Sequence, residues 1–283
     1  MCITSPVDIT TRDVVISTLR VCLLFVQGLT VKYFFCYFYL ALFQLILTRR
    51  SNLAALPKRG IILDLDNTIL DSAGESCERV RYLADQCGLP VEPNLKEAVL
   101  NSWKKSSGSF AFVQSIWPEE CTAKIVAFLN ARITYDQIVP YNLFPGVKKA
   151  LAVLQHFFYL SVLTNRSYAE TLSQLQMNKI DKYFNFIGAS DGPIGSNARK
   201  PALASFQPLW REYKQINISK DNIFLIGDTV ESDFRLARVC GLKFFAVISD
   251  IFTREEFLAA GVRPDCILDS VAELPALLVP SSK

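Results

Sequence analysis

Histidine is nearly absent from this sequence, since His156 is the only one among 283 residues. The eight cysteines are scattered, and no two of them form a Cys-x-x-Cys pair. Zinc sites usually draw on such pairs and on several histidines, so a zinc site of the usual kind is not expected. We expect the cysteines to be free thiols in a reducing compartment. No nucleophile surrounds His156, which favours a structural role for it over catalysis.

A strong excess of one charge is also missing. The formal net charge is +3, and the basic residues form no dense cluster. Nucleic-acid binding as the main role is therefore unsupported. Internal repeats and low-complexity segments are absent too, and the hydrophobic content of 51% is ample for a core. Beyond Ser51 the composition is typical of an ordinary α/β protein with one large or two modest domains.

Residues 1–58 differ in composition from the rest of the chain. Residues 21–48 are nearly all apolar, but their charge-free part, 33–48, is shorter than the roughly twenty residues that span a bilayer. A longer span would bury Lys32, which is costly. Arg49 and Arg50 would place the part of the chain that follows them in the cytoplasm. We expect an apolar helix outside the domain and keep three interpretations: a membrane anchor, a cleaved signal, or an extension without a stable fold.

The most informative stretch is 64–68, which directly follows a short apolar run at 61–63. Asp64 and Asp66 are two residues apart at the end of a predicted strand, so both carboxylates can point to one side, with Leu65 turned away. This pattern suits phosphoryl transfer through an aspartyl phosphate. The alternative is that the stretch, with Asn67 and Thr68, is only a turn and a helix cap.

Three further polar segments follow apolar runs in a fixed order. Thr164 and Asn165 directly follow the run 158–163. Lys200 lies in a loop after the apolar segment 183–189. Asp228 and Asp233 follow the run 223–226. An anionic substrate with a divalent metal needs such a hydroxyl, cation and carboxylate set. In an open α/β sheet these strand ends converge on one crevice.

The spacing of the predicted strands indicates a helical insertion. No core strand is predicted between 68 and 158, a gap too long for a plain connection, and helices are expected at 75–87, 95–105 and 119–132. After this insertion, predicted helices alternate with predicted strands. The helices are at 146–155, 167–177, 204–214, 231–240 and 271–278, and the strands are at 158–163, 223–226, 243–249 and 266–268. The fold class is therefore α/β, with a parallel sheet flanked by helices. We place the core at 59–71 and 144–283 and the helical insertion at 72–143.

The four polar segments together resemble the haloacid dehalogenase superfamily of phosphohydrolases, over about residues 59–279. The resemblance implies a Rossmann-like core and identifies the helical insertion as a C1 cap. It implies that Asp64 is the nucleophile and Asp66 the general acid and base. Phosphate would be bound by Leu65, Asp66, Thr164, Asn165 and Lys200. Mg²⁺ would be held by Asp64, Asp66 through its carbonyl and Asp228, with Asp233 supporting the metal site from behind.

The expected substrate is less well determined by the sequence. The segments DLDNTILDSAGES at 64–76, GDTVESD at 227–233, GLK at 241–243 and ELPALL at 273–278 are similar to phosphatases of N-acylneuraminate 9-phosphate. This favours sialic acid metabolism, with nucleoside monophosphates and phosphoglycolate as alternatives. A non-catalytic, membrane-tethered binding protein and a phosphotransferase are rival classes. The sequence does not indicate an oligomeric state.

Two departures from the family pattern bear on the substrate. Arg166 stands where relatives often carry glycine, so it either crowds the phosphate loop or adds a cation near the substrate. Ala198 and Arg199 stand where relatives often carry acidic residues. Within the helical insertion, the residues that we consider for substrate contact are Trp103, Lys104, Lys105, Arg132 and Tyr135.

Overall fold

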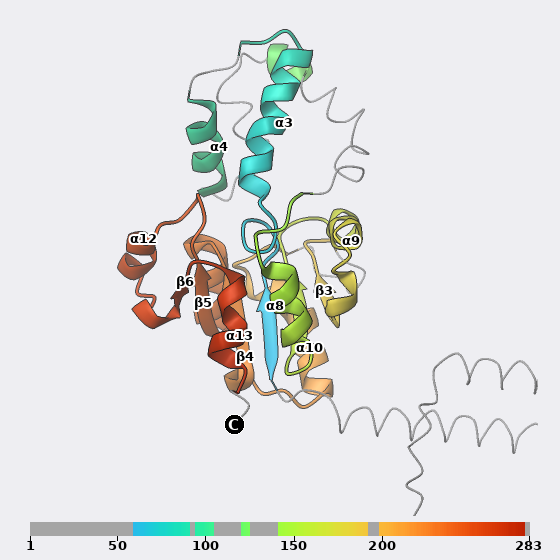
Figure 1. Cartoon of the computed structure of the whole chain (residues 1–283), viewed down its shortest axis with the longest axis vertical. Helices are drawn as coiled ribbons and strands as arrows, with labels where there is room; N and C mark the ends of the chain where they lie inside the picture. The colour runs from blue at the N-terminus through green and yellow to red at the C-terminus, as the bar shows by residue number, and fades with distance from the viewer. Residues whose placement is uncertain (1–58, 91–93, 105–119, 125–140, 192–197, 281–283) are drawn as a thin grey trace, which may run out of the picture. The chain divides into compact units, whose positions relative to one another are not determined.

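The protein's computed structural model describes residues 59–90, 94–104, 120–124, 141–191 and 198–280. Six parallel strands form one sheet in the order β3-β2-β1-β4-β5-β6 (Figure 1). They are β1 (Gly60–Leu63), β2 (Tyr159–Leu163), β3 (Phe186–Gly188), β4 (Ile223–Gly227), β5 (Lys243–Val247) and β6 (Ile267–Leu268). The parallel α/β fold expected from the apolar runs is therefore confirmed.

The strands are mostly apolar because both faces of the sheet are covered, and their polar members are Ser161 in β2 and Lys243 at the start of β5. Every residue of β1, β2 and β4 is buried. Ile61 and Leu63 belong to a hydrophobic cluster on one face. The intervening Ile62 is also fully buried but lies outside that cluster, as expected for side chains that alternate between the two faces of a strand.

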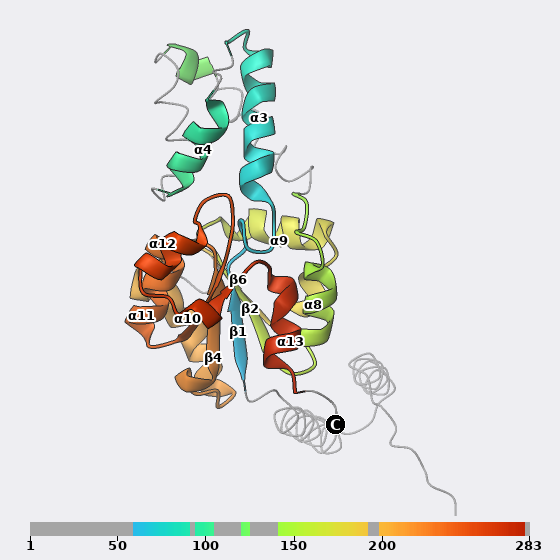
Figure 2. The same ribbon diagram turned by 60° about the vertical axis from the view of Figure 1, so that its left-hand side comes forward.

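Helices cover the two faces in two groups, which lie on opposite sides of the sheet in Figure 2. The first group is α8 (Val147–Leu154), α9 (Tyr168–Met177) and α13 (Leu274–Leu278), whose buried residues join the cluster of Ile61. The second group is α10 (Leu203–Gln215), α11 (Arg235–Cys240) and α12 (Arg254–Ala259). Tyr213 of α10 packs so closely on Gly60 that a Cβ there would lie 2.8 Å from its ring.

The predicted helix 231–240 differs from the observed one. Its first part, Val230–Phe234, is a π-helical turn, and α11 follows it. The carboxylate of Asp233 accepts hydrogen bonds from the hydroxyl (2.6 Å) and the backbone N–H (3.2 Å) of Thr229, which fixes this wider turn. Two predicted helix ends are confirmed: Ser167 caps α9, and Gly241, with φ of 68°, ends α11. The predicted helix 271–278 is divided into a 3-10 turn at Val271–Glu273 and α13.

Helices also occupy the described part of the stretch between β1 and β2. They are α3 (Ser72–Gln86), α4 (Leu95–Lys104) and a short helical piece at 120–124. No strand of the sheet lies in the described residues of this stretch. The limits of the helical insertion, 72–143, remain a prediction.

Several other expectations concern residues away from the sheet. The apolar segment 21–48 lies outside the described residues, and no helix in the described ranges is long and apolar enough to cross a membrane. His156 is exposed in the turn between α8 and β2, before the strand begins. The cysteines of the described part, Cys77, Cys87, Cys121, Cys240 and Cys266, are free.

Truncation of Ile62 tests this packing. Because its side chain is fully buried in a central strand, Ile62→Ala is expected to lower the free energy of unfolding by about 2–5 kcal/mol. The control Val153→Ala, at a side chain 41% exposed on α8, is expected to change it by less than about 0.5 kcal/mol. The measurement is urea denaturation followed by circular dichroism. Equal, small effects would contradict the assigned burial.

Candidate active site

The loop after β1 holds both a turn and a pair of carboxylates. The backbone N–H of Asp64 donates to Ile226 O at 2.9 Å, which continues the pairing of β1 with β4. Asn67 has a left-handed φ of 55°, and its side-chain oxygen accepts a hydrogen bond (2.7 Å) from the backbone N–H of Ala73 at the start of α3. The turn and helix cap that we considered as an alternative are therefore present at Asn67. Asp64 and Asp66 remain available for other contacts.

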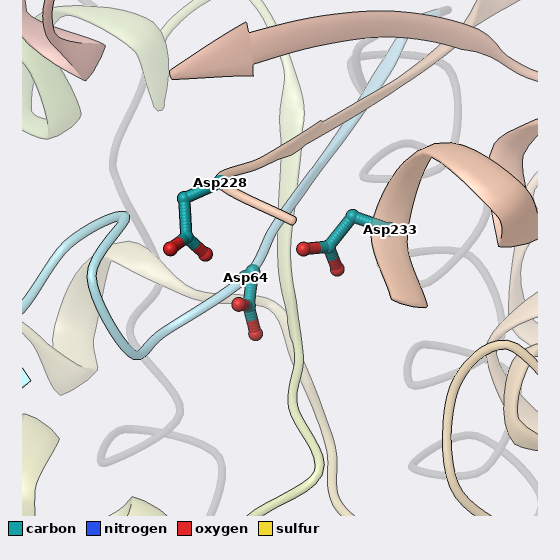
Figure 3. A group of neighbouring side chains, drawn as sticks. All are labelled: Asp64, Asp228 and Asp233. Carbon is teal, nitrogen blue, oxygen red and sulfur yellow. The ribbon is translucent and has the colours of Figure 1, made fainter. Parts of the chain in front are cut away.

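Three carboxylates from different elements meet at the carboxyl end of the sheet. Asp64 follows β1, Asp228 follows β4, and Asp233 lies in the π-helical turn. One oxygen of each lies within 4.8 Å of the others, and all three residues are buried. Figure 3 shows the three side chains turned toward a common volume.

A glycine makes this approach possible. A Cβ on Gly227 would lie 2.4 Å from the Asp233 carboxyl carbon, closer than any real Cβ contact. Only glycine fits between the end of β4 and this carboxylate, so the GD sequence at 227–228 is explained by packing as well as by charge.

Lys200 supplies the cation of this cluster. Its ammonium lies 2.6 Å from one oxygen of Asp64 and 2.6 Å from one oxygen of Asp233. Burial alone would lower the pKa of Lys200, but the two carboxylates raise it, so the ammonium stays charged. The loop after 197 and the sheet therefore share one buried ion-pair network.

The carboxyl groups of this network are costly to ionise. Burial, reinforced by Asp233 and Asp66 and opposed by Lys200, raises the pKa of Asp64 to about 7. Burial, with Asp64 and Asp233, raises the pKa of Asp228 well above its usual value. A cation that lay between them would relieve this cost.

The residues after β2 tie the neighbouring loops together. Asn165 accepts a hydrogen bond from the Lys200 backbone N–H (2.7 Å) and donates to its carbonyl (3.2 Å). Thr164 is buried, and its hydroxyl accepts a hydrogen bond from the Arg166 backbone N–H at 3.1 Å. The side chain of Asn165 thus fixes the position of Lys200, a function that the sequence did not suggest.

Three backbone N–H groups near Asp64 have no hydrogen-bond acceptor among the described residues. Those of Leu65, Asp66 and Asn165 form no hydrogen bond to the described residues. Leu65 is fully buried, and buried N–H groups without a partner are rare in folded proteins. Unpartnered N–H groups and a buried ammonium are suited to binding an anion. That these residues bind phosphate remains a prediction.

Asp66 is held by two side chains. Ser72, the first residue of α3, donates to its Oδ1 at 2.6 Å. Arg166 donates to the same oxygen at 2.6 Å and to Oδ2 at 3.3 Å. Burial would raise the pKa of Asp66, but the charge of Arg166 and these hydrogen bonds lower it overall. Asp66 is therefore a carboxylate in this state of the protein.

Sequence reasoning missed several hydroxyl groups of the site. Asp228 accepts hydrogen bonds from Ser249 (3.0 Å) and Thr68 (3.4 Å), and Ser249 comes from the loop after β5. Ser72 and Thr229 orient Asp66 and Asp233 in the same way. Serine and threonine are too common in loops for any of them to be singled out without the fold. Ser249 was predicted to be the last residue of the strand 243–249, whereas the observed strand β5 ends at Val247 and leaves Ser249 in the following loop.

The residues considered in the helical insertion do not join this cluster in the described part of the chain. Lys104 pairs with Glu256 at 2.5 Å and lies 5.3 Å from the centre of the Phe252 ring. It also lines a cavity of about 530 Å³ beside α4, which none of the predicted catalytic residues lines. Lys105, Arg132, Tyr135 and the side chain of Trp103 lie outside the described residues.

Comparison with known proteins identifies the family. The sequence matches the family of haloacid dehalogenase-like hydrolases over residues 61–247. The chain belongs to this family. A phosphoglycolate phosphatase of Yersinia pestis is 26% identical over 235 residues, which are 80% of this chain and 95% of the relative. A plasmid-borne phosphoglycolate phosphatase of Cupriavidus necator is 24% identical over 241 residues, which are 80% of this chain and 96% of the relative.

Solved structures of this family share the fold. A subfamily IA hydrolase of the haloacid dehalogenase superfamily from Geobacter sulfurreducens superposes with a TM-score of 0.61 at 20% identity. The match covers 79% of this chain and 97% of that one. The arrangement of sheet and helices is thus that of a haloacid dehalogenase-like hydrolase.

The acidic cluster fits a hard divalent cation. Carboxylate oxygens are the ligands that Mg²⁺ prefers. Asp233 is tied up by short bonds, from Lys200 and from the Thr229 hydroxyl at 2.6 Å each. Asp228 accepts only longer hydrogen bonds from two neutral hydroxyl groups, at 3.0 and 3.4 Å. Asp64 pairs with Lys200 through one oxygen, and its other oxygen has no partner among the described residues. Asp64 and Asp228 are therefore the members of the cluster best suited to hold a metal directly.

Removal of the buried cation tests the network. Lys200→Met would leave buried carboxylates unpaired and is expected to cost about 3–5 kcal/mol of unfolding free energy at pH 8. Lys200 opposes the effect of burial on the pKa of Asp64, so in the variant this pKa lies above its native value of about 7. The loss should therefore be largest well above pH 7 and should shrink as the pH falls toward 7, because Asp64 takes up a proton in the variant. The control Lys96→Met removes an ion pair with Asp250 at 2.9 Å, but the Lys96 side chain is 63% exposed. It should cost less than about 1 kcal/mol. A loss for Lys200→Met that does not depend on pH would argue against the network.

Proposed function

We infer that this chain is a phosphoric monoester hydrolase, and we propose that it works through an aspartyl-phosphate intermediate. The observation that carries the proposal is the combination of Asp64 with Lys200 and three unpartnered backbone N–H groups, which follow β1 and β2 at the carboxyl edge of the sheet. A carboxylate nucleophile needs a neighbouring anion-binding set if it is to approach a phosphate dianion. The phosphatase names of the relatives support the same chemistry.

In the first step, an oxygen of Asp64 attacks phosphorus and forms a P–O bond, while the bond from phosphorus to the leaving oxygen breaks. Asp66 is a carboxylate before the substrate binds, and the negative charge of the phosphate then raises its pKa, so that it takes up a proton from solvent. It gives this proton to the leaving oxygen, and the alcohol leaves. The N–H groups of Leu65, Asp66 and Asn165, together with Lys200 and the Thr164 hydroxyl, stabilise the charge on the other phosphate oxygens.

In the second step, water attacks phosphorus of the aspartyl phosphate. Asp66, now a carboxylate, takes the proton of the water, and the bond from phosphorus to Asp64 breaks. Inorganic phosphate is released and Asp64 is regenerated. The hydrogen bonds from Ser72 and Arg166 hold the Asp66 carboxylate ready for this step.

We propose Mg²⁺ as the cofactor, held by Asp64, Asp228 and the backbone carbonyl of Asp66, with Asp233 supporting the site through Lys200. When bound, it offsets the repulsion between the carboxylates and the phosphate dianion. Ser249 and Thr68 orient the Asp228 carboxylate for this task.

The proposed substrate is a small acid ester of the phosphoglycolate kind. Relatives with that name align over most of this chain, which favours phosphoglycolate over the N-acylneuraminate ester predicted from 64–76, 227–233, 241–243 and 273–278. Those segments lie largely in loops that contact the phosphoryl group or build the core. They do not report on the leaving group, so the sialic acid ester is retained only as a second candidate. A membrane tether through 21–48 also remains a prediction.

The test of this function is phosphate release from a panel of esters, with and without Mg²⁺. The panel contains 2-phosphoglycolate, N-acylneuraminate 9-phosphate and nucleoside monophosphates. We expect metal-dependent turnover, highest for phosphoglycolate, that Asp64→Asn lowers at least about 10³-fold. Asp85→Asn, the same change at an exposed site on α3, should leave turnover intact. Absence of turnover of every ester by the folded protein would sink the proposal and favour a binding protein.

The function of Asp66 is tested by the leaving group. Asp66→Asn is expected to lower kcat for phosphoglycolate by about 10²–10⁴-fold, because an alkoxide needs a proton to leave. The loss should be clearly smaller for p-nitrophenyl phosphate, since nitrophenolate leaves without one. The readout is the ratio of the two losses under identical Mg²⁺. Equal losses would remove Asp66 from leaving-group protonation.

A further inference from the structure

Arg166 occupies an unusual position for a charged residue. Its side chain is 10% exposed, and its guanidinium lies between the Asp66 carboxylate and the ring of Tyr141, with 4.9 Å from Cζ to the ring centroid. Tyr141 is buried, and its backbone N–H donates to Gln174 of α9 at 2.8 Å. Burying a cation in this way is costly unless it has a partner, and such sites are often functional.

The structure decides between the two expectations for Arg166. Its backbone N–H donates to Thr164, but its side chain turns to Asp66 and lies over Tyr141. The guanidinium is therefore a cation beside the acid and base. Nε and Nη2 donate to Asp66, and Nη1 has no hydrogen-bond partner within the described residues.

The positions of the two site cations are different. Lys200 lies between Asp64 and Asp233, where the phosphoryl group is bound. Arg166 contacts the carboxylate that must approach the leaving oxygen during proton transfer. A substituent one carbon away from the leaving oxygen is therefore brought toward the guanidinium.

We propose that Arg166 determines specificity by binding a carboxylate of the leaving group. This inference rests on the proposed phosphatase function and deepens it. The planar guanidinium pairs with carboxylates in a bidentate manner that a lysine cannot reproduce. The substrate class is a phosphate ester of a short α-hydroxy acid, whose carboxylate is separated from the leaving oxygen by one carbon. In N-acylneuraminate 9-phosphate the carboxylate lies at the opposite end of the sugar chain and cannot reach Arg166 from the same site.

Charge balance supports this assignment. The site contains four acidic side chains, Asp64, Asp66, Asp228 and Asp233, and two cations, Lys200 and Arg166. A phosphate dianion that also carries a carboxylate adds further negative charge. Lys200 lies between two carboxylates on the side of the site where the phosphate would bind. Among the described residues, Arg166 is therefore the cation left to pair with the carboxylate of the substrate.

The experiment compares two esters of equal length, 2-phosphoglycolate and 2-hydroxyethyl phosphate. They differ in a carboxylate against a hydroxymethyl group. We expect the wild-type chain to prefer 2-phosphoglycolate in kcat/KM, and Arg166→Gln to lower that preference by about 10- to 100-fold, the range for a hydrogen bond to a charged group. Arg166→Lys should restore only part of it. The control Arg199→Gln removes the same charge from an exposed residue beside Lys200 and should keep the wild-type ratio.

The outcomes separate this inference from the proposed function. If Arg166→Gln lowers kcat/KM for both esters equally, Arg166 acts only by positioning Asp66, and the inference fails while the phosphatase stands. The inference is also overturned if the wild-type chain hydrolyses both esters equally well. This comparison needs no variant, so it tests the inference even if Arg166→Gln folds poorly. Failure to hydrolyse either ester, or any other in the panel, overturns the proposed function itself.

Discussion

The buried ammonium of Lys200 is the interaction on which the rest of the site depends. It lies 2.6 Å from both Asp64 and Asp233, which belong to different loops, and Asn165 binds its backbone from a third. Without this cation, several carboxylates would share a volume closed to water, and their mutual repulsion would oppose the fold. In the proposed mechanism the same charge binds the incoming phosphate. One side chain would then supply both stability and anion binding.

Much of this arrangement could be predicted because parallel strands covered on both faces are apolar along their whole length. The runs at 61–63, 158–163 and 223–226 therefore indicated strands, and their polar successors indicated the site. Other features depend on contacts between distant residues. Nothing local distinguishes Ser249 or Ser72 from other loop serines, and only the fold brings them to Asp228 and Asp66. The π-helical turn at Val230–Phe234 likewise follows from the bonds of Asp233 to Thr229.

The substrate was harder to predict than the chemistry for a physical reason. Residues that contact the phosphoryl group meet the same atoms in every phosphate monoester, so similarity among them carries little information on the alcohol. The contact that we propose with the leaving group is made by Arg166, which the sequence marked only as a departure from the family pattern. The rotamer of the Arg166 side chain decides whether it crowds the phosphate loop or adds a cation near the substrate. That choice depends on Asp66 and on Tyr141, neither of which is near Arg166 in sequence.

Ser72 gives the site a mechanical connection that its chemistry alone does not require. It is the first residue of α3, and its hydroxyl is one of only two side-chain donors, among the described residues, to Asp66. If α3 tilts about its first turn, its last residues are displaced most, but the Ser72 hydroxyl also rotates. Any tilt of α3 consequently changes how many hydrogen bonds the Asp66 carboxylate receives. The orientation of α3 and the pKa of Asp66 are therefore coupled: a change in the orientation of the helix changes the pKa, and a change in the protonation of Asp66 changes which orientation is favoured.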